Sequence, residues 1–128
     1  MKMVRVDVVT MPSVNLNPNA KYDEKTDTWT EGLIPKPNNY WVLTKMKIRT
    51  MLSLAAKNKC EFIILGAWGC GVFKNNPVDI ADAFYEVLVD EGYERLFKQV
   101  VFAIINDSNS VGDNLSIFKE VLGYEDEF

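Results

Sequence analysis

The fold of this chain is constrained most strongly by Phe62–Phe73, which reads Phe-Ile-Ile-Leu-Gly-Ala-Trp-Gly-Cys-Gly-Val-Phe. Its first four residues form an unbroken apolar run, which is typical of a strand buried on both faces. Behind the glycines, Asn76 has the side chain of a helix cap and Pro77 fits the first helical turn. The segment is therefore predicted to fold as a strand, a glycine-rich loop and a helix in succession.

The loop contains three glycines, Gly66, Gly69 and Gly71, within six residues. A glycine has no Cβ to hold a ligand away, so backbone N–H groups can close around a phosphate. The N-terminus of the helix that follows adds partial positive charge. A tight turn without a ligand is the alternative interpretation, and we favour anion binding over it.

The composition is that of one folded domain, expected to span residues 1–128. Of the 128 residues, 48% are hydrophobic and 12% are aromatic, which excludes a disordered chain. The net charge is −4 and no stretch clusters Lys or Arg, so we expect no nucleic-acid partner. No apolar run approaches the roughly 20 residues of a membrane helix, so we expect no membrane partner. Histidine is absent, which excludes Ser-His and Cys-His catalytic pairs and argues against a transition-metal site; no cofactor is expected.

The two cysteines, Cys60 and Cys70, lie on either side of the apolar strand. Ten residues of mostly extended chain separate them by about 30 Å, which is too far for a disulfide. Free cysteines without a secretory signal favour a reducing, cytoplasmic location.

Two further strands are predicted from apolar patterns. Residues 3–10 alternate valine with other residues, which indicates a strand nearer a sheet edge. A nearly continuous apolar run indicates a strand within residues 97–105. Residues 17–40 hold most of the prolines and are expected to form a long surface loop.

Apolar residues at three- and four-residue steps predict three helices. The first covers residues 41–58, and the second runs from residue 77 to about residue 90, with Gly92 as its terminator. The last begins at a cap provided by Asp113 or Asn114.

The element order is therefore β-α-β-α-β-α, which predicts an α/β fold with a mainly parallel sheet and helices on both faces. Ligands in such folds bind beyond the carboxyl ends of the strands. Those ends are followed by residues 10–15, 66–73 and 106–110, which are rich in small polar residues or glycine. The sequence thus predicts a ligand site where these three segments meet.

The loop residues 66–73 read Gly-Ala-Trp-Gly-Cys-Gly-Val-Phe and are followed by Asn-Pro and a helix. This segment resembles the second phosphate-binding loop of microbial-type poly(ADP-ribose) glycohydrolases, a branch of the macrodomain superfamily. The resemblance extends to residues 8–10 with 14–16, to the basic amphipathic helix of residues 41–58, to residues 100–104 and to Asn114 with Phe118, and it covers most of the chain outside 17–40. It implies a truncated macrodomain-like fold and a ligand of the ADP-ribose type.

One part of the family pattern does not occur in this sequence. In the family, the catalytic loop is a glycine run followed by Gln-Glu-Glu, and it lies upstream of the strand that matches residues 4–10. The resemblance therefore implies a protein that binds ADP-ribose or a derived nucleotide without cleaving it, and we expect no catalytic residue. Such a binder would suit sequestration of an NAD-derived signal, for example by a viral protein that removes an immune messenger from the host cytoplasm.

Two other functions remain open. An ADP-ribosyl glycohydrolase would need a base, for which Asp7, Asp107 and Asp113 are the acidic residues near the predicted site, or a catalytic loop borrowed from a partner. A structural or regulatory subunit would keep the glycine loop without a ligand.

The residues expected to bind the ligand lie in the glycine loop or at strand ends. They are Gly66, Ala67, Trp68, Gly69, Cys70, Gly71, Val72, Phe73, Asn15, Asn106 and Asp107. The resemblance implies that Val72 and Phe73 give backbone contacts to the diphosphate and the distal ribose. Trp68 is expected either to stack on a base or ribose or to pack internally, and Cys70, without a histidine partner, is expected to be inert. The two asparagines suit ribose hydroxyls and are equally suited to turns.

The predicted strands also bear on assembly. Two strands that are apolar throughout need cover on both faces, whereas only three helices are predicted. The strand of residues 3–10 is expected to leave an unpaired sheet edge. We therefore expect the protein to form a homo-oligomer, at least a dimer.

Overall fold

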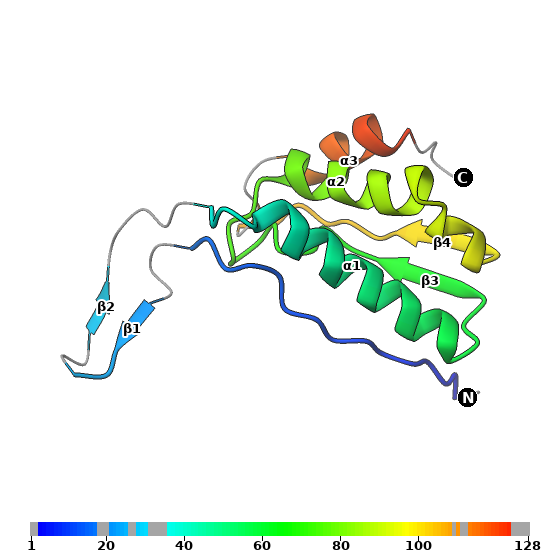
Figure 1. The fold of residues 1–128 in the computed structure, drawn as a ribbon, viewed down its shortest axis with the longest axis horizontal. Helices are drawn as coiled ribbons and strands as arrows, with labels where there is room; N and C mark the ends of the chain where they lie inside the picture. The colour runs from blue at the N-terminus through cyan, green and yellow to red at the C-terminus, as the bar shows by residue number, and fades with distance from the viewer. Residues whose placement is uncertain are drawn as a thin grey trace.

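The computed structural model describes residues 3–17, 21–25, 28–30, 36–108, 110 and 113–123. A short antiparallel hairpin comes first and is followed by alternating helices and strands (Figure 1). The elements are β1 (Lys21–Asp23), β2 (Thr28–Thr30), α1 (Tyr40–Lys57), β3 (Phe62–Leu65), α2 (Pro77–Tyr85), the π-helical turn η2 (Glu86–Asp90), the 3-10 turn η3 (Tyr93–Leu96), β4 (Gln99–Phe102) and α3 (Asn114–Leu122).

The strands β3 and β4 pair in parallel, with Ile63 opposite Val100 and Leu65 opposite Phe102. The connection between them runs through α2, as a parallel pair requires a crossover. Pairing continues beyond the assigned strands, because the Ala103 N–H donates to the Leu65 carbonyl at 2.7 Å. The predicted α/β class with a parallel sheet is confirmed.

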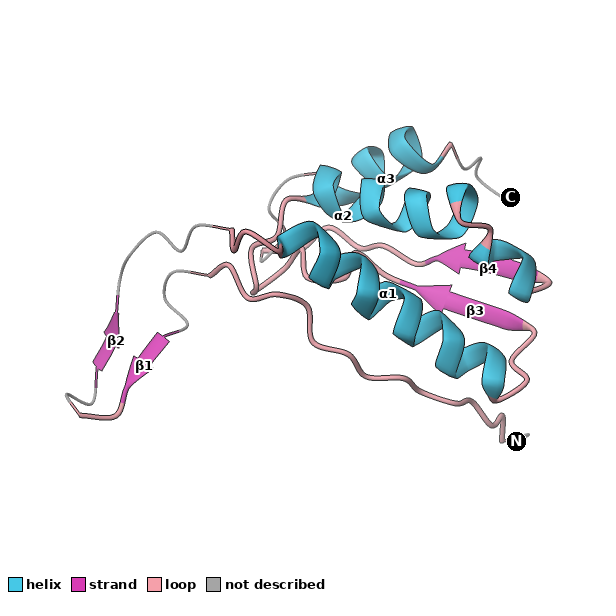
Figure 2. Ribbon diagram, in the orientation of Figure 1, coloured by secondary structure: helices cyan, strands magenta, loops and turns pink. Residues whose placement is uncertain are grey.

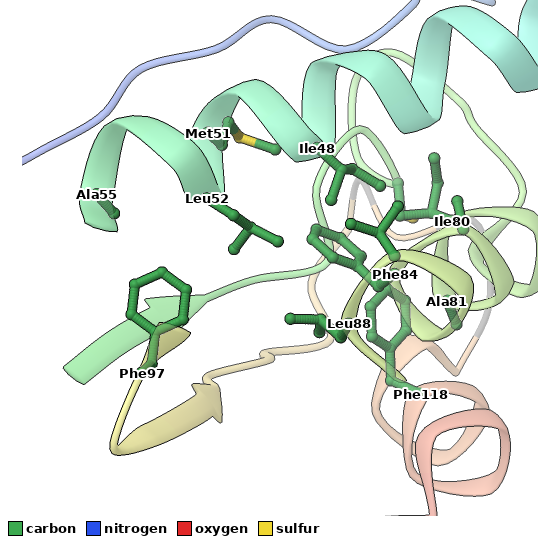
Figure 3. Close-up of a cluster of buried hydrophobic side chains, with 13 residues drawn as sticks. Ile48, Met51, Leu52, Ala55, Ile80, Ala81, Phe84, Leu88, Phe97 and Phe118 are labelled. Carbon is green, nitrogen blue, oxygen red and sulfur yellow. The ribbon is translucent and has the colours of Figure 1, made fainter. Parts of the chain in front are cut away.

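The core lies between the helices and one face of this strand pair. Ile48 and Leu52 project from α1 toward Phe84 and Leu88 of the α2 region, and the strands run beneath them (Figure 3). Every one of these four side chains is at most 1% exposed. Phe118 of α3 completes the same cluster.

A row of aromatic rings continues this core from the glycine loop to α3. Trp68 meets Phe84 edge to face with ring centroids 6.3 Å apart, and Phe84 meets Phe102 at 5.2 Å. Phe102 in turn packs against Phe118 at 5.8 Å. These separations are within the range of favourable aromatic pairs, so the loop is attached directly to the core.

The predicted ends of the helices are confirmed. The Asn76 side chain accepts the Val78 N–H at 2.9 Å, and Pro77 occupies the first turn of α2. The helical region ends before Gly92, whose φ of 81° is left-handed and favours glycine. Asp113 caps α3 by accepting the Ser116 N–H at 3.1 Å.

Residues 3–10 do not form the predicted strand. They run without regular structure past α1 and are exposed throughout the segment (Figure 2). Their valines alternate as a strand would require, but Val4, Val6 and Val8 are all more than 75% exposed. The pattern identified an extended segment, while strand pairing needs an edge to which its N–H and C=O groups actually bind.

The prediction that β3 is buried on both faces is wrong. Ile63 and Leu65 face the core, whereas Phe62 is 61% exposed and Ile64 is 73% exposed. The expected cover on this second face is not present among the described residues, because α1, α2 and α3 all contribute to the cluster on the first face.

The long loop predicted for residues 17–40 contains regular structure. It holds the β1–β2 hairpin, in which Tyr22 lies opposite Trp29 (Figure 2). Residues 18–20, 26–27 and 31–35 of that loop lie outside the described residues. Within the part of the chain that the structure describes, every helix is too short or too polar to cross a membrane.

Candidate ligand-binding site

The glycine loop leaves the sheet where both parallel strands end. Gly66 follows β3 directly, and a Cβ at this position would lie 3.6 Å from the Ala103 carbonyl oxygen, an ordinary contact distance. The loop then passes Trp68, Gly69 and Gly71 before α2 begins at Pro77. Its position is the one expected for a ligand site in a parallel α/β fold.

Gly69 is required by the protein itself. Its φ is +75°, and a Cβ would lie 2.4 Å from the Ser13 hydroxyl oxygen and 2.7 Å from the Ser13 Cβ. Real Cβ atoms do not approach so closely, so Gly69 allows residues 13–14 to pack against the loop. Packing within the protein therefore accounts for a glycine at this position.

Asn75 ties the loop to two other segments. Its side chain is fully buried, and its Nδ2 donates to the carbonyl oxygens of Val14 at 2.7 Å and Gly69 at 3.0 Å. The buried Tyr40 hydroxyl donates to the Asn75 Oδ1 at 2.6 Å. One side chain thus links the loop, the segment after residue 12 and the first turn of α1.

The structure brings the predicted segment around Asn15 alongside the loop. The Leu16 N–H donates to the Phe73 carbonyl at 2.8 Å, and the Asn17 Nδ2 donates to the Val72 carbonyl at 2.6 Å. Asn15 itself is exposed, and its Oδ1 accepts the Asn17 N–H at 2.9 Å, so it forms a local turn.

The far end of the loop contains backbone N–H groups that the described residues do not bond. The carbonyls of Gly71, Val72 and Phe73 are all bonded within the protein, to Lys74, Asn17 and Leu16 respectively. Among the described residues, no protein acceptor is bonded to the N–H groups of Gly71, Val72 and Phe73. The Val72 side chain is exposed, so this end of the loop is open to solvent. Three successive N–H groups without protein acceptors match the needs of an anion.

The start of α2 contributes less positive charge than the sequence indicated. Its first residue is proline, and its Val78 N–H is already bonded to Asn76. Asp79 adds a carboxylate to the first turn and pairs with Lys36. A carboxylate at a helix N-terminus offsets the partial charge that would otherwise favour a ligand anion.

Trp68 has the contacts of the internal-packing alternative. Its indole N–H donates to the Met11 carbonyl at 2.7 Å, and its ring meets Phe84. Cys70 is fully buried, and burial, together with the Asp79 carboxylate, raises the pKa of its thiol to about 12. A thiol that is both buried and protonated is inert, as expected from the missing histidine.

The residues after β4 form a capping network. The Asn106 side chain donates to the Asp113 carboxylate at 2.8 Å and accepts the Leu115 N–H at 3.3 Å. Asp107 forms a turn, in which its N–H donates to the Ser110 hydroxyl oxygen at 2.9 Å. Hydrogen bonds from Asn106 and Ser116 hold the pKa of Asp113 below its usual range, which makes it a weak base.

The three acidic residues weighed as catalytic bases are engaged in separate places. Asp7 accepts a hydrogen bond from the Cys60 thiol at 3.7 Å, near the amino end of β3. Asp107 and Asp113 lie beyond β4, and Asp113 is occupied as the cap of α3. Within the described residues, no group of three or more Cys, Asp and Glu side chains is arranged to hold a metal ion.

Sequence reasoning missed the residues that fix the loop. Asn75, Tyr40 and Ser13 were not singled out, although a pair of asparagines before a helix is visible in the sequence. Of that pair, Asn76 has the pattern of a cap and Asn75 has no such signal, because its partners Tyr40 and Val14 lie 35 and 61 residues away in the chain.

Neither the protein-family models nor the curated proteins searched contain a match to this chain. Among solved structures, it is similar to a point mutant of poly(ADP-ribose) glycohydrolase from Deinococcus radiodurans in complex with ADP-ribose, with 34% identity and a TM-score of 0.57. That match covers 66% of this chain and 33% of the other. A further structure of the Deinococcus radiodurans protein with ADP-ribose gives 26% identity and a TM-score of 0.58, over 80% of this chain and 48% of that one.

A third similar structure is the glycohydrolase from Thermomonospora curvata bound to the inhibitor ADP-HPD. It has 27% identity and a TM-score of 0.59, over 73% of this chain and 37% of the other. The chain therefore spans less than half the length of each of these three proteins. The predicted resemblance and the macrodomain-like fold are confirmed for that part.

Proposed function

We propose that this chain, a partial domain of the poly(ADP-ribose) glycohydrolase type, binds ADP-ribose or an ADP-ribose-derived nucleotide without cleaving it. The observation that carries the proposal is the open end of the glycine loop. There the N–H groups of Gly71, Val72 and Phe73 have no protein acceptor among the described residues, while the carbonyls of the same residues are bonded within the protein. A diphosphate supplies the acceptors that such a row of N–H groups lacks. The similar structures with bound ADP-ribose support this choice of ligand.

The other predicted site residues take supporting roles in this proposal. Residues 66–70 hold the loop against the core and against Ser13. Three predicted site residues outside the loop are exposed: Asn15, Asn106 and Asp107. They lie in the segments that were predicted to meet at the carboxyl ends of the strands, so we propose that they contact the ribose groups. Their present hydrogen bonds are local, and a ligand would have to compete with them.

The absence of cleavage is proposed for this 128-residue polypeptide as it stands. It contains neither the glycine run nor the Gln-Glu-Glu that the family resemblance associates with catalysis. The candidate bases Asp7 and Asp113 are held apart in separate hydrogen bonds. A polypeptide with these properties would retain its nucleotide intact, which is the requirement for sequestering an NAD-derived signal, as in a viral protein that counters host immunity.

Two measurements test binding and cleavage separately. Isothermal titration with ADP-ribose should give a 1:1 complex, and adenosine, which lacks the diphosphate, should bind far more weakly. A ligand concentration 100 times Kd should raise the free energy of unfolding by about 2.7 kcal/mol. Chromatography after overnight incubation with ADP-ribose or poly(ADP-ribose) should return each unchanged.

Two outcomes contradict the proposal in different ways. No response to ADP-ribose, NAD or cyclic ADP-ribose isomers would favour the structural or regulatory subunit. Release of ADP-ribose from the polymer by the purified chain, lost in Asp107→Asn, would identify a glycohydrolase.

We also infer a cytoplasmic location and self-association. Cys60 and Cys70 are both free thiols, which a reducing compartment preserves. Self-association follows from the apolar side chains that β3 exposes to solvent, since a face of this kind is normally covered.

A further inference from the structure

Lys74, the residue that follows the glycine loop, has a backbone conformation that favours glycine. Its φ is +58°, in the left-handed region, where a Cβ crowds the following carbonyl oxygen. Among the described residues, Lys59 is the only other non-glycine residue with a positive φ, at +61°. Both lysine side chains are exposed. The two positions therefore share a residue type and a strained backbone, and the comparison shows what is particular to Lys74.

The fold accounts for the φ of Lys74 but not for its side chain. The Lys74 N–H donates to the Gly71 carbonyl at 3.0 Å, and the next N–H, of Asn75, donates to the Gly69 carbonyl at 2.9 Å. This turn leaves Asn75 fully buried and Lys74 exposed. A glycine would make the same turn without strain. A lysine at this position therefore needs a reason other than the turn.

The lysine at position 59 has such a reason in the end of α1. The Lys59 N–H donates to the Ala56 carbonyl at 3.0 Å and the Cys60 N–H to the Ala55 carbonyl at 3.1 Å, which is a common way for a helix to end. A cation is also favourable beside the partial negative charge of a helix C-terminus. Lys74 lies instead before the N-terminus of α2, and a helix N-terminus favours anions over cations. Helix electrostatics therefore explains Lys59 and not Lys74.

Lys74 is the one cation in the segment that forms the candidate site. Between residues 66 and 79, it is the sole basic residue and Asp79 is the sole acidic residue. Asp79 is paired with Lys36, whereas Lys74 forms no ion pair with any residue that the structure describes. The chain has a net charge of −4, so the molecule as a whole repels a phosphate. An unpaired cation beside the loop offsets that repulsion.

The position of Lys74 suits an anion on the open end of the loop. The N–H groups of Gly71, Val72 and Phe73 can donate hydrogen bonds to a phosphate, but they carry no net charge. The turn that the Lys74 N–H closes onto Gly71 keeps the Cα atoms of these two residues within about 7 Å of each other. Lysine places its ammonium group at the end of a long, flexible stem. The ammonium group can therefore reach a phosphate that is bound to these N–H groups.

We propose that Lys74 pairs with the diphosphate that these N–H groups hold and makes the site selective for charged phosphate ligands. The inference rests on the proposed function and adds to it a residue outside the predicted site. A diphosphate joined to two sugars carries two negative charges, for which the backbone supplies hydrogen bonds and Lys74 supplies the countercharge. An uncharged nucleoside gains nothing from Lys74.

Isothermal titration with ADP-ribose and with adenosine tests the inference. Lys74→Gly removes the charge and retains the turn, and it should raise the Kd for ADP-ribose about tenfold. Its affinity for adenosine should stay within twofold of the wild type. Lys74→Arg retains the charge, so its affinity for ADP-ribose should stay within threefold. The affinity of Lys74→Gly for ADP-ribose should also fall less steeply than that of the wild type as salt is raised from about 0.05 M to about 0.5 M.

Lys59→Gly is the matched control. It removes the same side chain from a position with nearly the same φ, at the far end of α1 from the glycine loop. Each glycine variant loses strain in the folded state and gains freedom in the unfolded chain, so urea unfolding should change little and to a similar extent in both. Only Lys74→Gly should lose affinity for ADP-ribose.

The outcomes separate this inference from the proposed function. Wild-type binding of ADP-ribose that Lys74→Gly retains within twofold, or that Lys59→Gly loses equally, would overturn the role of Lys74 and leave the proposed function standing. A wild-type protein that does not bind ADP-ribose would reject the proposed function, and inorganic pyrophosphate then decides about Lys74. Pyrophosphate binding that is lost in Lys74→Gly would support its role, and no binding of pyrophosphate by the wild type would overturn it.

Discussion

At the scale of single residues, the glycines of the loop have two different purposes. Gly69 has a left-handed φ and leaves no room for a Cβ against Ser13, so the fold requires it. Gly71 is not among the residues with positive φ, and its neighbours Val72 and Phe73 have N–H groups without a protein acceptor among the described residues. The sequence pattern treats the two glycines alike, because spacing carries no information about which side of the loop meets the protein.

This difference predicts opposite effects for substitutions two residues apart. Gly71→Val should weaken ADP-ribose binding at least tenfold, because a branched side chain blocks the approach of a phosphate to the backbone. Its thermal unfolding curve should stay close to that of the wild type. Gly69→Ala should instead lower the free energy of unfolding by about 1 to 3 kcal/mol, from strain at positive φ and the clash with Ser13.

Calorimetry and urea unfolding of both variants provide the check. An affinity of Gly71→Val within threefold of the wild type, with an unchanged unfolding curve, would mean that the phosphate does not lie on this loop.

Two buried groups that lose a proton at high pH, the Cys70 thiol and the Tyr40 hydroxyl, should make stability depend on pH. Burial raises the pKa of the Cys70 thiol to about 12, and burial also raises the pKa of the Tyr40 hydroxyl to about 12. Both groups hold their protons more tightly when folded than in the unfolded chain, where they titrate at about 9 and 10. The folded state therefore binds more protons in this range, and its stability must fall as the pH rises from about 9 toward 12.

Urea unfolding at several pH values from about 8 to about 11 should show this decline. Cys70→Ala removes one of the two groups and should make the decline shallower, with little change at about pH 8. Stability that is constant or rises over this range would show that neither group titrates as the burial of its side chain requires.

At the scale of secondary-structure elements, the sequence correctly predicted the helix ends, which depend on residues close to them in the chain. The Asn-Pro start of α2, the Gly92 terminator and the Asp113 cap are all confirmed, because each depends on atoms within a few residues. Residues 3–10 failed as a strand for the opposite reason. Alternating valines allow an extended chain, but a strand needs a partner elsewhere in the molecule, and the pattern cannot supply it.

The cap of α2 gives a test at this scale. Asn76→Ala removes the acceptor of the Val78 N–H and should lower the free energy of unfolding by about 1 kcal/mol. ADP-ribose affinity should change less than threefold, since the N–H groups proposed to bind the diphosphate lie in the loop and not in α2. Urea unfolding and calorimetry measure the two effects.

Asp113→Ala removes the equivalent cap of α3 and serves as the comparison. A large loss of affinity in Asn76→Ala alone would assign part of the anion site to the first turn of α2.

At the scale of the whole molecule, the sequence predicted which segments lie beside the loop but not what holds them together. Residues 10–15 were expected there as the carboxyl end of a parallel strand, and the structure brings residues 13–17 to the loop although residues 3–10 form no strand. The buried network of Asn75, Tyr40 and Ser13 joins segments far apart in the chain, so no local pattern reveals it. The exposed face of β3, which carries Phe62 and Ile64, was likewise hidden, because an apolar run has the same sequence whether one or both of its faces are covered.

The proposed self-association makes stability depend on protein concentration. If two copies cover the exposed apolar face of β3 in the folded state and separate on unfolding, mass action stabilises the folded protein as concentration rises. A hundredfold increase in the micromolar range is worth about 2.7 kcal/mol per dimer, which corresponds to a rise in Tm of about 5 °C for two chains of this size. Phe62→Lys, which adds a charge to that face, should melt at the same temperature at both concentrations, whereas Val42→Lys, at an exposed position of α1, should follow the wild type. Circular dichroism melting of the three proteins at both concentrations measures this, and equal shifts in all of them would place the contact between copies somewhere other than the exposed face of β3.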